Sequence, residues 1–323
     1  MRPSGCLRLE AANGRTNGVL GFWKRLRVLK RSPDTARLPD FLVIGAMKSG
    51  TTTLHYDLAS VPEIFMPLTK EPACLVDDSV LTPEGMMLYA RHYRRASVRQ
   101  RCGDASTAYA KLPQFTRVPE RALQVLGPTT KIIYVVRDPV HRLVSHHRHE
   151  YSKGAMPYNI EEALSRFPEL VAYSSYKMQL VPWLTLFGRS NIKVISFESY
   201  IRSRKDTIAE LAQHLNVPGN LDLIDFSRSH NVGPRVPVNR FAQTFISSSL
   251  YREWMRRFIS PSVRDALRKK LASSPSLPEP PPLAEDRMMQ LATLFKADMA
   301  WLGSQFDLDL RWVSTLDSDV QGP

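Results

Sequence analysis

Four apolar runs in the first two thirds of the chain are typical of strands in a buried sheet. They lie at residues 41–46, about 98–102, 131–136 and 191–197. Continuous runs such as FLVIGA and KIIYVV suit strands that are covered on both faces. Each run precedes a segment that can form a helix, and strands that alternate with helices imply right-handed crossovers and a parallel sheet. The pattern therefore predicts one three-layer α/β domain, in which helices flank a central parallel sheet.

Helical spacing of apolar positions predicts further elements and the domain boundaries. This spacing occurs at residues 159–187 and 204–216, and again in an amphipathic closing helix at 283–302. A proline-rich connection at 273–286 leads into that closing helix. No internal repeat and no second hydrophobic pattern requires another domain. The predicted divisions are a basic arm at 1–38, the folded domain at 39–316 and a tail at 317–323.

The basic arm contains one amphipathic stretch. GFWKRLRVLKR places Phe22, Leu26 and Leu29 on one helical face, with basic residues around it. A membrane-surface helix over residues 18–31 is one interpretation; a short helix docked on the domain, or a solvated arm, is the other. We favour the second interpretation, because a single short amphipathic stretch is weak support for membrane binding.

The charge and the cysteine content narrow the choice of binding partners and of cellular compartment. Forty-four Lys and Arg against 31 Asp and Glu give a net charge of +13 and a pI of 9.8, which favour anionic partners such as nucleotides, acidic sugars or nucleic acid. Cys6, Cys74 and Cys102 form neither a disulfide framework nor a zinc-ligand spacing, so a reducing compartment is expected. Residues 18–23 are too short for a signal-peptide core, and no run approaches the ~18 apolar residues of a membrane span. We therefore expect a cytoplasmic protein.

The first apolar run leads into a loop that is typical of phosphate binding. Gly45 and Gly50 have the separation of the glycines in a Walker A loop, but the lysine is Lys48, inside the loop. Threonines at 51 and 52 stand where that motif has Lys and Ser/Thr. A strand, loop and helix in this order direct backbone N–H groups and the helix dipole at an anion. The magnesium-binding arrangement is missing and we identify no Walker B segment, so the loop departs from that of a kinase.

A second anion site is predicted at the end of the run at 131–136. Asp138 is a good helix N-cap and Pro139 a good first helical residue, so a helix should begin there. Arg137 then lies at the carboxyl end of a parallel strand, where open α/β sheets bind ligands, and its guanidinium group suits bidentate contact with a phosphate. Ser145, about two turns further on, adds a hydroxyl. The alternative is an arginine that only caps or bridges the edge of the sheet.

The two motifs, IGAMKSGTTTL and YVVRDPVHRLVSHHRH, resemble those of the sulfotransferases that use 3′-phosphoadenosine 5′-phosphosulfate (PAPS). The resemblance runs from about residue 39 to 313, and it points to the carbohydrate or heparan-type branch and to a soluble, bacterial-type member. It implies a P-loop-containing fold. It also implies transfer of a sulfuryl group from PAPS, which leaves 3′,5′-phosphoadenosine (PAP) and requires no metal.

The resemblance implies roles for individual residues. The 5′-phosphosulfate would be held by Lys48, Ser49, Gly50, Thr51, Thr52 and Thr53, and the 3′-phosphate by Arg137 and Ser145. Tyr176 matches a tyrosine found near the nucleotide in the carbohydrate branch. Asn231 and Arg235, within residues 227–241, occupy the place of a late loop that closes over the nucleotide. A plain surface loop is the alternative for that segment.

The segment MPLTKEPACL resembles the part of the carbohydrate branch that carries the catalytic base. By that match Glu71 is the base and Lys70 binds beside it on the substrate, while Lys48 stabilises charge on the leaving phosphate. A solvated pair of Lys70 and Glu71 is the alternative. In the family a histidine and aromatic residues follow the glutamate, whereas residues 73–75 here are Ala, Cys and Leu.

A second acceptor-facing segment also departs from the family pattern. GDASTAY at residues 103–109 corresponds to a family segment near the acceptor, which makes Ser106 a candidate for substrate binding. The lysine of that segment is Ala105 here, and its proline is Thr107. The nucleotide half of the predicted site is therefore standard, and the acceptor half is not.

Histidines are concentrated in HRLVSHHRHE. His146 and His149 share a helical face, which suggests a metal, but zinc sites usually need three or four converging ligands. A basic, partly exposed face beside an anionic ligand fits better, and no metal is predicted. A histidine base from this cluster remains the alternative to Glu71.

The predicted function is sulfuryl transfer to a hydroxyl of a sugar, glycolipid or small metabolite. The alternatives are a P-loop kinase or NTPase, which would need magnesium–ATP, and a non-catalytic nucleotide- or nucleic-acid-binding protein. The displaced lysine argues against the kinase. Aromatic residues make up only 9% of the chain and do not interleave with arginines, as a single-strand platform requires. We expect no nucleic-acid partner and leave the oligomeric state open.

Overall fold

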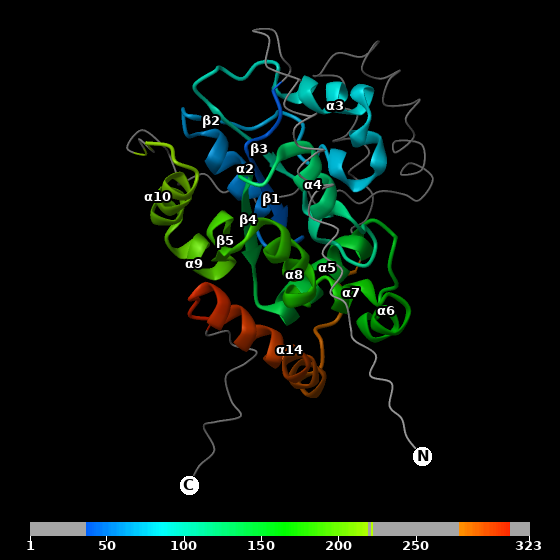
Figure 1. Cartoon of the computed structure of the whole chain (residues 1–323). Helices are drawn as coiled ribbons and strands as arrows, with labels where there is room; N and C mark the ends of the chain where they lie inside the picture. Colours follow the sequence, from blue (N-terminus) through cyan, green and yellow to red (C-terminus); the bar gives the residue numbers. More distant parts are fainter. Residues whose placement is uncertain (1–36, 219–220, 222–277, 311–323) are drawn as a thin grey trace, which may run out of the picture. The chain divides into compact units, whose positions relative to one another are not determined.

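Five parallel strands form the centre of the fold. The computed structural model describes residues 37–218, 221 and 278–310. Within them the strands are β1 (Phe41–Gly45), β2 (Ile64–Phe65), β3 (Arg101–Ala105), β4 (Lys131–Val136) and β5 (Ile192–Ser196). They follow the order β2-β3-β1-β4-β5, and every neighbouring pair is parallel (Figure 1). The predicted central parallel sheet is confirmed.

Several predictions fall on parts of the chain outside the described residues. These are the arm up to residue 36, the tail at 317–323, and the segment 227–241 with Asn231 and Arg235. The compact unit that contains the sheet begins at Arg37. The division into arm, domain and tail therefore stays a prediction.

Helices flank the sheet on both sides (Figure 1). In the described part of the chain they are α2 (Thr51–Ala59), α3 (Pro83–Ala90), α4 (Val118–Leu126), α5 (Pro139–Ser152), α6 (Ile160–Arg166), α7 (Glu169–Ala172), α8 (Tyr176–Phe187), α9 (Phe197–Arg202), α10 (Arg204–His214) and α14 (Glu285–Phe306). The predicted helix at 204–216 corresponds to α10, and the predicted closing helix to α14.

Apolar side chains on the two faces of the sheet belong to separate hydrophobic clusters. In β1, Leu42 and Ile44 join a cluster that contains Trp183 of α8. Phe41 and Val43 point the opposite way and join a cluster that includes residues of α2, α9 and α10. Because successive residues of a strand point to opposite faces, a continuous apolar run is what burial on both faces requires. The result is the three-layer arrangement that the sequence predicts.

The third strand lies further along the chain than predicted. The prediction of a strand at 98–102 was wrong in its bounds, because Val98 is 91% exposed and lies in a turn where Gln100 accepts a hydrogen bond from the Ser97 N–H. The observed strand continues through Gly103, which pairs with Phe41 of β1. A Cβ at position 103 would lie 2.2 Å from the Phe41 ring, so only glycine allows this approach. The small and polar residues at 103–105 hid the strand from the hydrophobic pattern.

Two further differences concern short elements. The sequence pattern missed β2, because a strand of two residues is too short to show a periodicity. The predicted helical stretch at 159–187 is divided into α6, α7 and α8, and the first break falls at Phe167–Pro168. Proline disfavours the helical conformation of the residue before it, so α6 ends there.

Helix α14 packs its apolar face against α5 and α8. Leu291, Phe295 and Leu302 are buried, whereas Met289 and Leu294 are exposed. This division of the surface confirms the predicted amphipathic helix. Among the helices of the described residues, none combines the length and the apolar character needed to cross a bilayer.

Candidate active site

A cavity of about 550 Å³ lies where the carboxyl ends of the parallel strands meet. Of the residues predicted from sequence, eight line it: Lys48, Gly50, Thr51, Thr52, Lys70, Glu71, Arg137 and Ser145. They come from segments that follow β1, β2 and β4, and from α5. Carboxyl ends of parallel strands share one edge of a sheet, so this fold brings distant segments of sequence together.

The loop after β1 presents free backbone donors to the cavity. Gly50 precedes α2 with φ 80°, and a Cβ there would lie 2.7 Å from the ring of Phe197. No side chain caps α2, and its hydrogen-bond ladder starts from the N–H of Leu54. The N–H groups of Thr51 and Thr52 therefore lack helical partners and are available to an anion.

Lys48 occupies a constrained position in this loop. Its φ is 71°, a left-handed conformation that is uncommon outside glycine. Its carbonyl oxygen accepts a hydrogen bond of 3.2 Å from Nη1 of Arg137. Burial lowers the pKa of Lys48, and the nearby charges of Lys153 and Arg137 lower it further. Lys48, Arg137 and Lys153 carry like charges, which repel one another in a partly buried cavity. A bound anion would relieve this repulsion.

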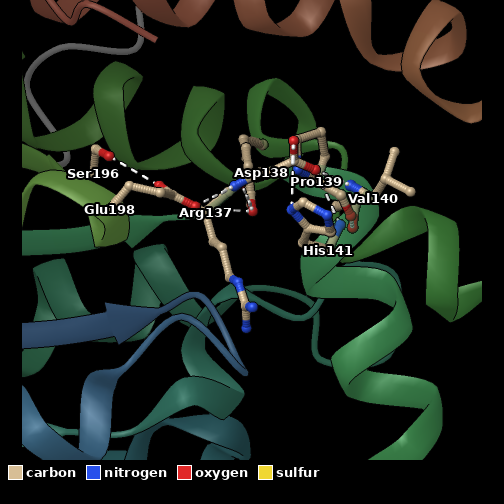
Figure 2. Close-up of polar contacts among 9 residues, drawn as sticks. Arg137, Asp138, Pro139, Val140, His141, Ser196 and Glu198 are labelled. Atoms are coloured by element: carbon tan, nitrogen blue, oxygen red, sulfur yellow. Dashed lines mark hydrogen bonds and ion pairs between the residues drawn. The ribbon is translucent and has the colours of Figure 1, made fainter. Parts of the chain in front are cut away.

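The segment after β4 begins α5 as predicted (Figure 2). The carboxylate of Asp138 accepts hydrogen bonds from the N–H groups of Val140 and His141, at 2.9 and 3.0 Å, and Pro139 is the first helical residue. Glu198 accepts from the Asp138 N–H at 3.1 Å and from the Ser196 hydroxyl at 3.0 Å. The turn from β4 into α5 is therefore held in place by the side chains of Asp138 and Glu198.

The guanidinium group of Arg137 extends away from these carboxylates (Figure 2). It lies 4.9 Å from the centre of the Phe197 ring. The hydroxyl of Tyr176 donates to the Arg137 carbonyl at 2.7 Å and accepts from its N–H at 3.2 Å. Tyr176 is fully buried and lies outside the cavity lining, so its place in this structure is beneath Arg137.

Three other predicted residues also lie outside the lining. Ser49 and Thr53 are buried, and neither hydroxyl has a hydrogen-bond partner among the described residues. Ser106 is buried as well: its hydroxyl donates to Asp104 at 2.7 Å and accepts from the Ala73 N–H at 3.0 Å. The Ser106 side chain, which is predicted to bind substrate, thus supports the neighbouring loop and lies outside the cavity lining.

Glu71 is held by contacts from several segments. Its carboxylate lies 2.5 Å from the ammonium group of Lys70 and accepts a hydrogen bond of 3.2 Å from the Thr107 hydroxyl. Its backbone N–H donates to the carbonyl of Ala105 at the end of β3, at 3.2 Å. The φ of Glu71 is 59° and that of Ala73 is 53°. Positive φ values at two non-glycine residues mark a loop whose shape is imposed by its surroundings.

A buried polar network lies beneath this loop. The carboxyl group of Asp104 is fully buried and accepts hydrogen bonds from Tyr89, Ser106 and Tyr109, at 2.6 to 2.7 Å. Burial raises the pKa of Asp104, and the three hydroxyl donors oppose that rise. Since Ser106 binds the backbone of Ala73, the network connects β3 to the Glu71 segment.

Helix α5 supplies one wall of the cavity through Ser145, His149 and Glu150, and the C-cap residue Lys153 extends this wall. Glu150 accepts a hydrogen bond of 3.0 Å from Lys153. Burial, followed by the charges of Lys48 and Lys153, lowers the pKa of His149 to about 4, so its imidazole is neutral at pH 7.

The second histidine of the predicted pair has a different environment. His146 is buried and stacks on Tyr173 with ring centroids 5.6 Å apart, and burial lowers its pKa to about 2. His149, not His146, is therefore the histidine that reaches the cavity. Among the described residues, no three His, Cys, Asp or Glu side chains are grouped as metal ligands.

A family model for the sulfotransferase domain matches residues 38–271. This match includes the loop with Lys48, the segment with Glu71 and the start of α5. The chain belongs to the sulfotransferase domain family. The resemblance of the two motifs is thus confirmed at the level of the family.

Two relatives match part of this sulfotransferase domain. The human protein heparan sulfate glucosamine 3-O-sulfotransferase 6 is 26% identical over 204 residues, which are 58% of this chain and 55% of the human protein. The membrane-associated sulfotransferase kil1 of Dictyostelium discoideum is 33% identical over 111 residues, which are 33% of this chain and 22% of that protein. The chain thus spans about half the length of the first relative and less of the second.

The fold of the sulfotransferase domain also has a counterpart among solved structures. A sulfotransferase from Alicyclobacillus acidocaldarius has a TM-score of 0.56 and 22% identity to this chain, and it covers 85% of this chain and 98% of its own. At this identity the likeness shows the fold alone. The predicted P-loop-containing α/β fold is confirmed.

The structure adds cavity residues that the sequence did not reveal as such. They are Met47, Thr107, Lys111, Glu150, Lys153 and Phe197, together with His149, which the sequence left among several histidines. A signal existed for part of this set, because positions 145, 149 and 153 recur every four residues along α5 and its C-cap. Lys111 follows β3 without any local pattern, so only the fold brings it to the cavity.

Proposed function

We propose that the protein transfers a sulfuryl group from PAPS to a hydroxyl of an acceptor and releases PAP. The observation that carries this proposal is the convergence of two separate anion-binding segments, at the ends of β1 and β4, with a carboxylate in one cavity. Membership of the sulfotransferase family supports the reaction class. No metal is part of the proposed site.

The loop after β1 would hold the 5′-phosphosulfate. Lys48, Thr51 and Thr52 line the cavity, and no side chain caps the start of α2. Arg137 and Ser145 would hold the 3′-phosphate. An arginine that lies on an aromatic ring and is fixed through its backbone loses little freedom when it binds a phosphate, which favours affinity.

Glu71 would act as the general base. Its carboxylate takes the proton of the acceptor hydroxyl as that oxygen bonds to sulfur. The bond from sulfur to the bridging phosphate oxygen breaks at the same time, and its electron pair leaves on that oxygen. Lys48 and the loop N–H groups stabilise the charge that develops there. The hydrogen bond from Thr107 keeps one oxygen of Glu71 in a defined orientation.

The acceptor is proposed to be a sugar or another hydroxyl-bearing metabolite. The human relative, whose name includes heparan sulfate glucosamine, supports the carbohydrate branch at 26% identity. A bacterial-type protein in the cytoplasm is also part of the proposal. The described thiols, Cys74 and Cys102, are both free, as a reducing compartment allows.

A thermal-shift titration tests the donor. A ligand that binds only the folded protein stabilises it by about 2.7 kcal/mol at a hundred times its dissociation constant. We expect PAP to raise the melting temperature without divalent metal, and ATP to do so weakly with or without magnesium. Lys48→Ala should abolish the response to PAP. Transfer of labelled sulfuryl groups from PAPS to a panel of sugars then tests the reaction.

A kinase would give the reverse result. If magnesium–ATP stabilises the protein and PAP does not, the proposal fails. It also fails if Lys48→Ala responds to PAP as the wild-type protein does. Arg166→Ala is a suitable control, because Arg166 pairs with Glu162 on the surface of α6 and lies outside the cavity lining.

A further inference from the structure

Lys111 is a cavity residue whose ammonium group forms no direct ion pair within the described part of the chain. Lys70 pairs with Glu71 at 2.5 Å, and Lys153 pairs with Glu150 at 3.0 Å. For Lys111, no carboxylate of the described residues lies within 4.0 Å of the ammonium group, and its nearest recorded contact is the face of the Tyr173 ring at 5.7 Å. A partly buried ammonium group is costly unless an anion neutralises it.

The backbone around Lys111 is held in place. Both backbone groups of the next residue bind one buried side chain, because the Leu112 N–H donates to Oε1 of Gln179 at 2.8 Å and its carbonyl accepts from Nε2 at 3.0 Å. The carbonyl of Lys111 accepts from the Phe115 N–H at 3.1 Å. Tyr173, whose ring lies under the ammonium group, donates its hydroxyl to Gln114 at 2.5 Å. The lysine therefore extends from a fixed support.

The position of Lys111 in the fold places it on the acceptor side. It follows β3, the strand whose end also carries Thr107 and supports Glu71. Arg137 follows β4, and β1 lies between these two strands in the sheet. The two anionic groups of the donor are already assigned to the β1 loop and to the β4 end. Lys111 is thus left for a third anion, close to the base.

We propose that the acceptor carries an anionic group, either a carboxylate or a sulfate ester, which pairs with Lys111 while the neighbouring hydroxyl reacts. This inference rests on the proposed function. Burial lowers the pKa of Lys111, the charges of Glu71 and Glu150 oppose that effect, and a bound anion would act in the same direction as these carboxylates. An acidic sugar combines such an anion with hydroxyls a few bonds away.

Binding of matched sugars to the PAP-saturated protein tests the inference. The probes are methyl β-D-glucoside, methyl β-D-glucuronide and methyl β-D-glucoside 6-sulfate, which differ only at C6. Isothermal titration should show that at least one charged probe binds about tenfold or more tightly than the neutral one, as expected for a charge-assisted contact. The two charged probes distinguish a carboxylate from a sulfate ester.

Two variants assign the preference to one residue. Lys111→Met should remove the preference and leave PAP affinity unchanged. Lys193→Met removes the same charge from a surface pair with Glu210, outside the cavity lining, and should keep the preference. Thermal melting of both variants checks that they are folded.

Several results would overturn the inference. Equal binding of charged and neutral probes, or no binding of any probe, contradicts an anionic acceptor. A preference that survives in Lys111→Met assigns it to another residue, and a loss of PAP affinity in that variant assigns Lys111 to the donor. If the wild-type protein does not bind PAP at all, the proposed function fails before the inference is reached.

Discussion

The two halves of the cavity are built in different ways. On the proposed donor side, Lys48 and Arg137 each lie within three residues of the end of a strand, and the adjoining helices begin within a few residues. On the proposed acceptor side, Glu71 is positioned by Thr107 and by the carbonyl of Ala105, which lie more than 30 residues further along the chain. One half is local in sequence, and the other depends on long-range contacts.

This difference has consequences for how each half can change. A loop between a strand and a helix obtains its donors from backbone geometry, which few side chains can alter without disturbing the fold. The acceptor half depends on hydroxyls and carboxylates from separate segments, such as Asp104 and Ser106. We expect single substitutions there to change which acceptor binds without changing the affinity for the donor. The departures from the family pattern at residues 73–75, 105 and 107 all fall in this half.

The largest expected effect separates chemistry from donor binding. Glu71→Gln should lower the rate of sulfuryl transfer by about 10²- to 10⁴-fold, the usual contribution of a general base. Its PAP affinity should match the wild-type value, because the donor half is untouched. His149→Gln, measured in the same assay with saturating PAPS, tests the other candidate base. A large loss in His149→Gln together with an active Glu71→Gln would exchange their roles.

The next effect concerns the 3′-phosphate. A hydrogen bond to a charged group contributes about 1.5–3 kcal/mol, so Arg137→Ala should weaken PAP binding roughly 10- to 100-fold. Adenosine 5′-monophosphate lacks the 3′-phosphate, and its affinity should hardly change. Isothermal titration of both nucleotides measures the difference. An equal loss for both would place Arg137 at the 5′ end instead.

Much of the donor half could be predicted from sequence, because its signals are local. Neighbouring residues predict the loop around Lys48, the N-cap at Asp138 and the position of Arg137, and the structure brings Lys48 and Arg137 to one cavity. Tyr176 was assigned near the nucleotide, but only the fold shows that it binds the backbone of Arg137. Residues 231 and 235 lie outside the described part of the chain.

The acceptor half was harder to predict for a physical reason. Ser106 was expected to contact substrate, whereas its neighbour Thr107 reaches the cavity and Ser106 turns into the protein. Ser106 is extended and follows β3, whereas Thr107 begins a short 3-10 helix over Thr107–Ala110, and a match to a family segment does not show which way each side chain points. Leu112, the residue after Lys111, and Gln179 come together through tertiary packing alone. No periodicity in the sequence reports such a contact.

Acidification should lower the stability of the folded protein. His146 is buried beside Tyr173 with a pKa lowered to about 2, so protonation favours the unfolded chain below pH 6.5. Stability from this group is therefore complete above pH 6.5 and is lost as the pH falls towards the folded pKa. Linkage gives about 2 kcal/mol lost by pH 5. Urea unfolding at several pH values should show that the free energy of unfolding falls more steeply on acidification for the wild-type protein than for His146→Phe. The same pH dependence in both proteins would contradict this prediction.

The smallest expected effect concerns the orientation of the base. Thr107→Val keeps the shape of the side chain but removes the hydroxyl that donates to Glu71. Loss of one such bond, about 0.5–1.5 kcal/mol, predicts a two- to tenfold fall in kcat with little change in PAP affinity. Thr107→Ser should restore the rate. If serine does not restore it, the methyl group of Thr107 matters more than its hydroxyl.

The most direct test of separate donor and acceptor halves is to compare the affinity for PAP of three proteins, measured without divalent metal. Isothermal titration should give equal values for the wild-type protein and Glu71→Gln, and a much weaker value for Arg137→Ala. That pattern would assign the donor to the ends of β1 and β4 and leave Glu71 to the acceptor. Equal affinities in all three proteins, or a loss confined to Glu71→Gln, would contradict the account.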